Sequence, residues 1–112
     1  MEHINKIELR GIVGSVRNNE YNGTKVANFS LVTELLHKSK DGNITAETTW
    51  HNIVAWEGKG IQNTEQIVKG AAVHVTGRIR DSRYTSADGV EKQFQEVLAN
   101  RIRIVDPSET DN

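Results

Sequence analysis

Two tryptophans, Trp50 and Trp56, are the residues of this chain whose type and spacing most clearly suggest a chemistry. They lie six residues apart in segment 48–56, in a chain with only 5% aromatic residues. If the segment is a β-strand, alternation places both indoles on the face opposite Ile53 and Ala55. Burial of that smaller face would leave two flat rings on an outer surface, where each could stack on a base of a single-stranded nucleic acid. The alternative is that the tryptophans pack in the core, and the strand alone slightly favours this alternative.

A run of arginines ahead of Tyr84 is a second candidate for the same chemistry. Arg78, Arg80 and Arg83 all precede the tyrosine in a predicted strand over residues 72–84. Alternation places Arg78 and Arg80 on the same face as the ring. Cations beside a stacking ring would neutralise phosphates, which favours a nucleic-acid surface. A solvated face with an edge-packed tyrosine is the alternative.

Composition limits the classes of protein to consider. A chain of 112 residues with 36% hydrophobic side chains predicts one globular domain. Three acidic residues, at positions 106, 109 and 111, follow the last basic residue; without them, 14 basic against 12 acidic side chains leave a charge of +2. This balance permits a local basic stripe without proving one. The absence of cysteine excludes disulfides and thiolate metal sites.

Several other classes find no support in the sequence. No apolar run is long enough to cross a bilayer, and residues 1–6 lack a signal-peptide pattern, so we expect a cytoplasmic protein. His3, His37, His51 and His74 lack metal-ligand spacing, so we expect no metal. We expect His51 to be a hydrogen-bonded core histidine, because it falls on the small-residue face. No phosphate-binding loop, nucleophile elbow or catalytic carboxylate pair is present, so we expect neither an enzyme nor a cofactor.

The strands that must position these residues follow from alternating apolar side chains. They are predicted over residues 4–17, 25–35, 46–56, 72–84 and 93–105. The apolar phase shifts near Gly11 and Gly14, which predicts a β-bulge or barrel corner. Segment 57–69 has helical spacing and predicts a short helix. Five strands with one helix between the third and fourth predict an all-β OB-fold barrel as a domain over 1–105, followed by a short acidic disordered tail over 106–112.

Several short segments, taken in order, match one family. They are Asn5-Lys6, Gly11 and Gly14, Val26–Leu31, Thr49-Trp50-His51, Lys69-Gly70 and Val73–Arg80. Together they run from about Asn5 to Val105, and the ordered set resembles the bacterial single-stranded DNA-binding protein (SSB) family. The resemblance implies an OB-fold that binds single-stranded DNA.

The resemblance also implies roles for individual residues. Base stacking is implied for Trp50, Trp56, Tyr84 and, at the position of a fourth family aromatic, His37. Phosphate contacts are implied for Lys38, Lys40, Lys69, Arg80 and Arg83, and the strand pattern adds Arg78 to this set. The chain departs from the family at Asn52, where arginine is frequent, and this removes one positive charge.

The implied function is sequence-nonspecific binding and protection of single-stranded DNA in replication, recombination or repair. The resemblance further implies a homo-oligomer at the nucleoid, a tetramer in the family, with a dimer as the alternative. The acidic tip ending in Pro-Phe that recruits replication proteins in the family is not found here. This departure predicts a short, tail-less form and puts such recruitment in doubt.

Two other functions stay open at this point. One is an OB-fold protein-interaction module of a replication or primosome assembly, in which the face carrying Trp50 and Trp56 binds protein. The other is a small enzyme or sugar-binding barrel, which would need a deep pocket with converging carboxylates. The sequence does not show one.

Overall fold

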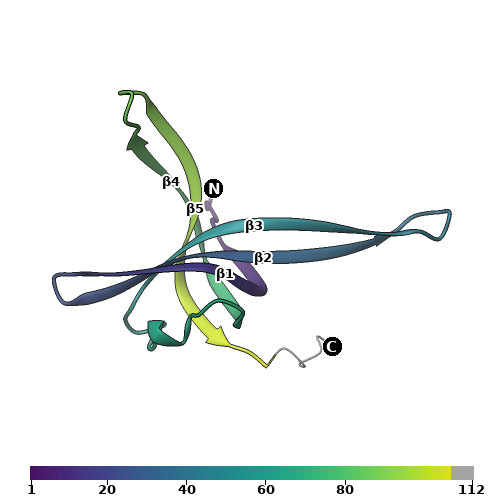
Figure 1. Ribbon diagram of the computed structural model, residues 1–112, viewed down its shortest axis with the longest axis horizontal. Coiled ribbons are helices and arrows are strands. Elements are labelled where there is room, and N and C mark those ends of the chain that lie inside the picture. The colour runs from purple at the N-terminus through teal and green to yellow at the C-terminus, as the bar shows by residue number, and fades with distance from the viewer. Residues whose placement is uncertain (107–112) are drawn as a thin grey trace.

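Five long strands account for most of the chain: β1 (Ile7–Tyr21), β2 (Thr24–Lys38), β3 (Ile44–Trp56), β4 (Ala72–Thr85) and β5 (Glu91–Ile104). The computed structural model, which describes residues 1–106, closes them into a barrel in the order β1-β2-β3-β5-β4 (Figure 1). All neighbours are antiparallel except β3 and β5, whose short parallel pairing completes the barrel. The predicted five-stranded barrel is confirmed.

The first hairpin turns within two residues. Asn22 and Gly23 have φ values of 52° and 81°, and Tyr21 pairs directly with Thr24. Two successive residues with positive φ are typical of the turn whose twist matches that of antiparallel strands, and Asn-Gly is its preferred sequence. The strands therefore run further than the predicted 4–17 and 25–35, and the turn between them is only two residues long.

The barrel bends at two irregular points in its sheet. Pairing between β1 and β2 shifts register between Val13 and Val16, which confirms the bulge predicted there. Pairing between β4 and β5 shifts between Thr76 and Gly77. A Cβ atom at Gly77 would lie 2.3 Å from the carbonyl oxygen of Leu98, so only glycine allows the two strands to approach this closely.

The predicted helix over 57–69 is reduced to a single 3-10 turn, η1 (Thr64–Gln66). Gly58 and Ile61 instead form a tight turn in which each backbone NH donates to the other's carbonyl. Ile61 and Ile67 are nonetheless buried, as a segment that covers the barrel interior requires. The apolar spacing thus marked the buried residues correctly but not the backbone conformation.

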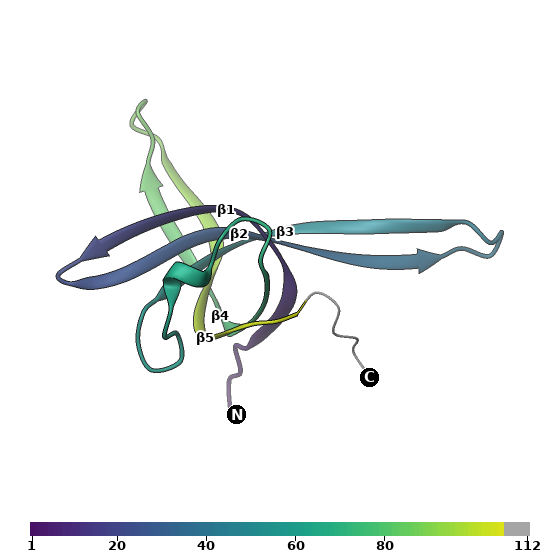
Figure 2. The same cartoon turned by 60° about the horizontal axis from the view of Figure 1, so that its bottom comes forward.

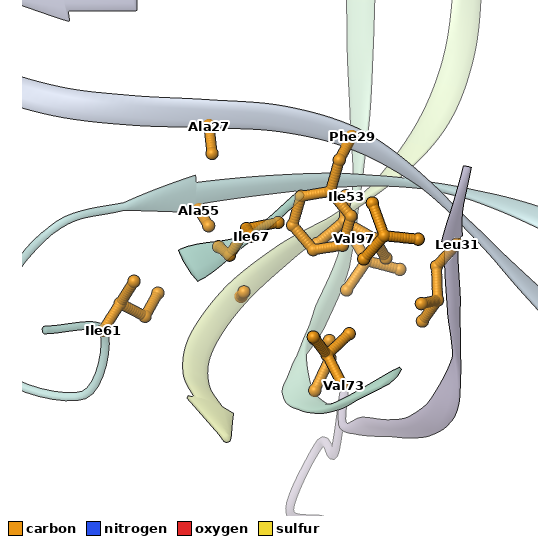
Figure 3. Packing of buried hydrophobic residues seen from close by; sticks show 12 residues of the cluster. Ala27, Phe29, Leu31, Ile53, Ala55, Ile61, Ile67, Val73 and Val97 are labelled. Atoms are coloured by element: carbon orange, nitrogen blue, oxygen red, sulfur yellow. The ribbon is translucent and has the colours of Figure 1, made fainter. Parts of the chain in front are cut away.

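The core fills the barrel with side chains from every strand and from the segment before β4. Its buried members are Val13, Ala27, Phe29, Leu31, Ile53, Ala55, Ile61, Ile67, Val73, Val75, Val97 and Ala99, and Figure 3 shows how they converge. Small and branched side chains dominate, which suits the narrow interior of a five-stranded barrel. This core holds the sheet whose outer face carries the candidate site.

Three hairpins extend beyond the barrel in different directions (Figures 1 and 2). The β2–β3 pairing continues to Lys38 and Ile44, and the β4–β5 pairing continues to Thr85 and Glu91. Side chains on these extensions are exposed on both faces. The hairpins therefore enlarge the surface that the small barrel can offer to a long ligand.

A side chain extends the sheet at the start of β1. The Asn5 amide donates from Nδ2 to the carbonyl of Ile79 at 2.6 Å, and its Oδ1 accepts from the Ile79 NH at 3.0 Å. The amide group thus substitutes for a peptide unit beside β4. This pair of bonds anchors the N-terminal segment to the barrel.

Candidate nucleic-acid interface

The two tryptophans of β3 lie on the outer face of the sheet. Trp50 is 59% exposed and Trp56 is 41% exposed, whereas Ile53 and Ala55 on the other face are fully buried. The barrel closes on the smaller side chains, so core packing of the indoles is excluded for this fold. At about 3.3 Å per residue, the six-residue spacing separates the two rings by about 20 Å along the strand.

Trp50 reaches across β2 to lie over β1. A Cβ atom at Gly14 would fall 2.6 Å from Cζ3 of the indole and 2.7 Å from the Ser30 Oγ, so the ring rests on the glycine of the β1 bulge. Carbon atoms in contact normally lie about 3.5–4.0 Å apart. The bulge and its glycine therefore make the space that the Trp50 ring occupies.

Trp56 is accompanied by a tyrosine that the sequence did not single out. The Tyr21 ring lies 5.9 Å from the Trp56 ring, with the two planes tilted by 47°. Tyr21 is 55% exposed and ends β1 just before the Asn-Gly turn. The first strand was predicted to end at residue 17, which left Tyr21 outside any strand. The sequence could have indicated its position, because Tyr21 directly precedes the Asn-Gly pair of a two-residue hairpin turn and should therefore end a strand.

Tyr84 also has an aromatic neighbour. The Phe94 ring on β5 lies 5.8 Å away in an edge-on arrangement, and both rings are partly exposed. Phe94 was missed because Tyr84 pairs in register with Lys92, and the two rings meet diagonally. The outer surface thus carries two aromatic pairs and the single Trp50.

A groove with a volume of about 420 Å³ lies on this outer face. On β3 it is lined by residues 52–54, which lie between the two tryptophans. Its other lining residues come from β1, β2 and β5: Ser15, Val16, Arg17, Asn28, Phe29, Ser30, Phe94 and Glu96. The groove therefore presents both polar side chains and the exposed Phe94 ring, which suits bases that stack and hydrogen-bond on one face.

Two of the predicted arginines lie beside this groove. Arg78 and Arg80 share the outer face of β4 with Tyr84, as alternation predicts. The Arg80 Nε donates to Oε1 of Glu96 at 2.8 Å, and this carboxylate is only 9% exposed. The ion pair orients Arg80 and partly offsets its charge.

Arg83 and Lys69 lie apart from that pair. Arg83 is on the opposite face of β4, where its Nη1 lies 3.5 Å from Oε1 of Glu91. Lys69 is exposed, and the adjacent Gly70 NH donates to the carbonyl of Val13 at 2.8 Å. This bond places Lys69 beside the start of the β1 bulge. The structure therefore places Lys69 and Arg83 in different parts of the molecule.

The remaining predicted residues lie at the far end of the β2–β3 hairpin. Lys38 is the last residue of β2, three residues beyond the predicted end of that strand, and Lys40 lies in the turn. His37 occupies the face of the hairpin opposite to that of Trp50, by alternation along β2 and β3, and lies 2.9 Å from the Glu47 carboxylate. The structure therefore does not bring His37 together with the stacking rings.

The histidine predicted for the core is hydrogen-bonded, as expected, but it is only partly buried and is not a member of the core. His51 is partly buried, and its Nε2 lies 2.9 Å from the Thr33 hydroxyl oxygen. Burial lowers the pKa of His51 below its ordinary value. His51 therefore supports the barrel wall beneath the outer face.

A larger cavity of about 840 Å³ lies between residues 59–67 and the end of β5. Lys59 and Arg101 contribute positive charge to it, and none of the exposed aromatic rings lines it. The exposed aromatic rings therefore accompany the smaller groove and not this cavity. Within residues 1–106, no group of three or more His, Asp or Glu side chains is arranged to hold a metal ion, and no helix is long and apolar enough to cross a membrane.

Comparison with known proteins extends these observations. The family model described as the single-strand binding protein family matches residues 4–105. A single-stranded DNA-binding protein of Xanthomonas axonopodis pv. citri (strain 306) is 35% identical over 104 residues, which cover 91% of this chain and 58% of that protein. The chain thus spans less than two thirds of this relative's length.

Solved structures agree with this match. A Plasmodium falciparum SSB in complex with single-stranded DNA superposes with a TM-score of 0.76 at 28% identity, covering 95% of this chain and 98% of that chain. A deletion mutant of the single-stranded DNA-binding protein from Thermus aquaticus gives 0.75 at 18% identity, over 94% of this chain and 52% of that chain, and supports the fold alone. The predicted OB-fold is confirmed.

Proposed function

The chain belongs to the single-strand binding protein family, and from this premise we propose that it binds and protects single-stranded DNA in replication, recombination or repair. The observation that carries the proposal is the exposure of Trp50 and Trp56 on the outer face that also holds the groove, with the core on the opposite face of their strand. Stacking rings tolerate every base, so binding is largely independent of sequence. The role is one of binding, without catalysis.

In this proposal, aromatic rings on the outer face bind the bases and positively charged side chains bind the phosphates. Bases stack on Trp50, Trp56 and Tyr84, and the neighbouring Tyr21 and Phe94 rings support the latter two. Phosphates are neutralised by Lys69, Arg78 and Arg80 near the groove and by Lys38, Lys40 and Arg83 where the strand continues along the hairpins. His37 contributes at the hairpin only if it leaves Glu47.

We further propose that the protein acts as a homo-oligomer in the cytoplasm, at the nucleoid. A single barrel of this type covers about 4–16 nucleotides, so several barrels are needed to protect a longer strand. Light scattering at several protein concentrations distinguishes a tetramer from a dimer. A monomer at all concentrations would refute this part of the proposal.

The direct test of DNA binding is tryptophan fluorescence during titration with oligo(dT), at low and at high salt. Stacking on Trp50 or Trp56 should quench the emission, and salt should reverse the quenching because DNA binding releases counterions. The variants Trp50→Phe and Trp56→Phe assign the signal to each ring. Unchanged emission and no binding at low salt, with folded protein, would refute the proposed function.

One observation favours a second function, in which the chain is an interaction module for other proteins. Leu35, Leu36 and Ile44, at the end of the β2–β3 hairpin, are each at least 60% exposed. Such a patch suits an apolar protein surface. If this were the main function, the chain would capture a protein partner in a salt-insensitive manner and would not bind oligo(dT).

A further inference from the structure

A buried carboxylate lies in the floor of the groove. Glu96 is only 9% exposed, and it lines the groove beside Phe94. Its Oε1 accepts the Arg80 hydrogen bond, while its Oε2 accepts no hydrogen bond from residues 1–106. A carboxylate acts only as an acceptor, so the second oxygen can still receive a donor from a ligand.

The residues next to Glu96 continue this polar floor across the sheet. Ile53 pairs with Val97, so Asn52 and Glu96 directly precede paired residues on neighbouring parallel strands. Asn52 pairs in turn with Ser30 on β2. The Asn52 side-chain amide makes no hydrogen bond within the described part of the chain, although both groups line the groove. Glu96 and Asn52 together offer acceptors and one amide donor toward the same space.

The chemistry of these groups does not suit a phosphate. A carboxylate repels the DNA backbone, whereas it accepts hydrogen bonds from base amino groups, as Glu and Asp do from cytosine N4. Asn52 lies two residues beyond Trp50 on the same face, about 7 Å along the strand. A base that lies in the groove would therefore place its hydrogen-bonding edge over Asn52 and Glu96.

We propose that Glu96, with Asn52, forms a base-reading position within the groove, which favours cytosine over thymine through the exocyclic amino group. The proposal rests on the proposed binding of single-stranded DNA and adds a preference at one nucleotide of an otherwise nonspecific track. The Glu96 carboxylate accepts from the cytosine N4 amino group, and the Asn52 amide donates to cytosine N3 or O2. Thymine places its O4 acceptor at the same position, where two acceptor oxygens face each other and repel.

The first test uses the unaltered protein and changes only the DNA. Affinities are measured for short oligomers of dC and for the same oligomers with deoxyzebularine, which is cytosine without its 4-amino group. Loss of the amino group should weaken binding at least about tenfold, as expected for one hydrogen bond to a charged acceptor. Equal affinities, with both oligomers bound, would overturn the base-reading position and leave the proposed function intact.

The second test compares two variants that remove the same charge. Glu96→Gln should lower the ratio of dC to dT affinity about fivefold, because a neutral amide accepts more weakly and can also donate to thymine O4. Glu91→Gln, on the opposite face of β5, should change both affinities alike and leave the ratio unchanged. A ratio unaffected by Glu96→Gln would overturn the proposal. Failure of the unaltered protein to bind either oligomer would instead refute the proposed function.

Discussion

Replacing Gly14 with alanine tests whether the β1 bulge positions Trp50 for stacking. The added Cβ would lie 2.6 Å from Cζ3 of the indole, about 1 Å closer than carbon atoms normally approach. The backbone at Gly14 has no positive φ, so alanine is compatible with the local conformation. Trp50 is 59% exposed and can swing toward solvent, so we expect the fold to survive and the ring to be displaced.

The expected cost to binding follows from the loss of one stacking platform. Stacking of one base on an aromatic side chain is worth about 1–3 kcal/mol by alanine substitution, which corresponds to about 5- to 150-fold in Kd. A displaced ring keeps some contact, so Gly14→Ala should weaken binding about five- to tenfold, at the lower end of that range. Fluorescence anisotropy with a labelled oligo(dT), at one fixed salt concentration, measures the change.

Two further proteins make the result decisive. Gly58→Ala is the matched control, because its added Cβ has no atom within 4 Å, and it should bind as the unaltered protein does. In the double variant of Gly14→Ala with Trp50→Ala, the glycine change should add little to the tryptophan change, since only the contact of the added Cβ with Ser30 Oγ then remains. Normal binding by Gly14→Ala, or additive effects in the double variant, would refute the reasoning.

Three other predictions concern stability. Leu31→Ala, at a fully buried core position, should lower the free energy of unfolding by about 2–5 kcal/mol in urea denaturation at fixed protein concentration. Asn5→Ala removes both hydrogen bonds to Ile79 and should cost about 1–2 kcal/mol; an unchanged urea midpoint would show that the amide does not anchor the segment. Because burial lowers the pKa of His51, the unfolded state binds its proton more readily, and stability should fall as the pH drops below about 6.5. His51→Gln should therefore lose less stability than the unaltered protein between about pH 7.5 and about pH 5.5, as thermal melts can measure.

Local patterns determined much of this protein. Alternation placed Trp50 and Trp56 together on one face of a strand, because side-chain direction in a strand depends only on parity. The glycines and the phase shift in β1 likewise predicted the bulge, because a residue without Cβ marks close approach. Ordered short segments were enough to indicate the family, which the comparison confirmed.

Which face becomes the core is a property of the closed barrel. Neither alternation nor composition shows whether the face of Trp50 or the face of Ile53 is buried. The outcome depends on which side chains fit the narrow interior once β3 pairs with β5. The segment over 57–69 shows the same limit. Its isoleucines had to be buried, but two glycines and the path between β3 and β4 allowed only one 3-10 turn.

Local sequence patterns do not predict which side chains of different strands come into contact. Tyr21 meets Trp56 across the sheet, and Glu96 meets Arg80 through the register of β4 and β5. Each pairing joins residues separated by 16 or more positions, and only the register of folded strands brings them together. The types of residue in the candidate site were thus readable from the sequence, whereas the groove on their face was decided by the tertiary structure.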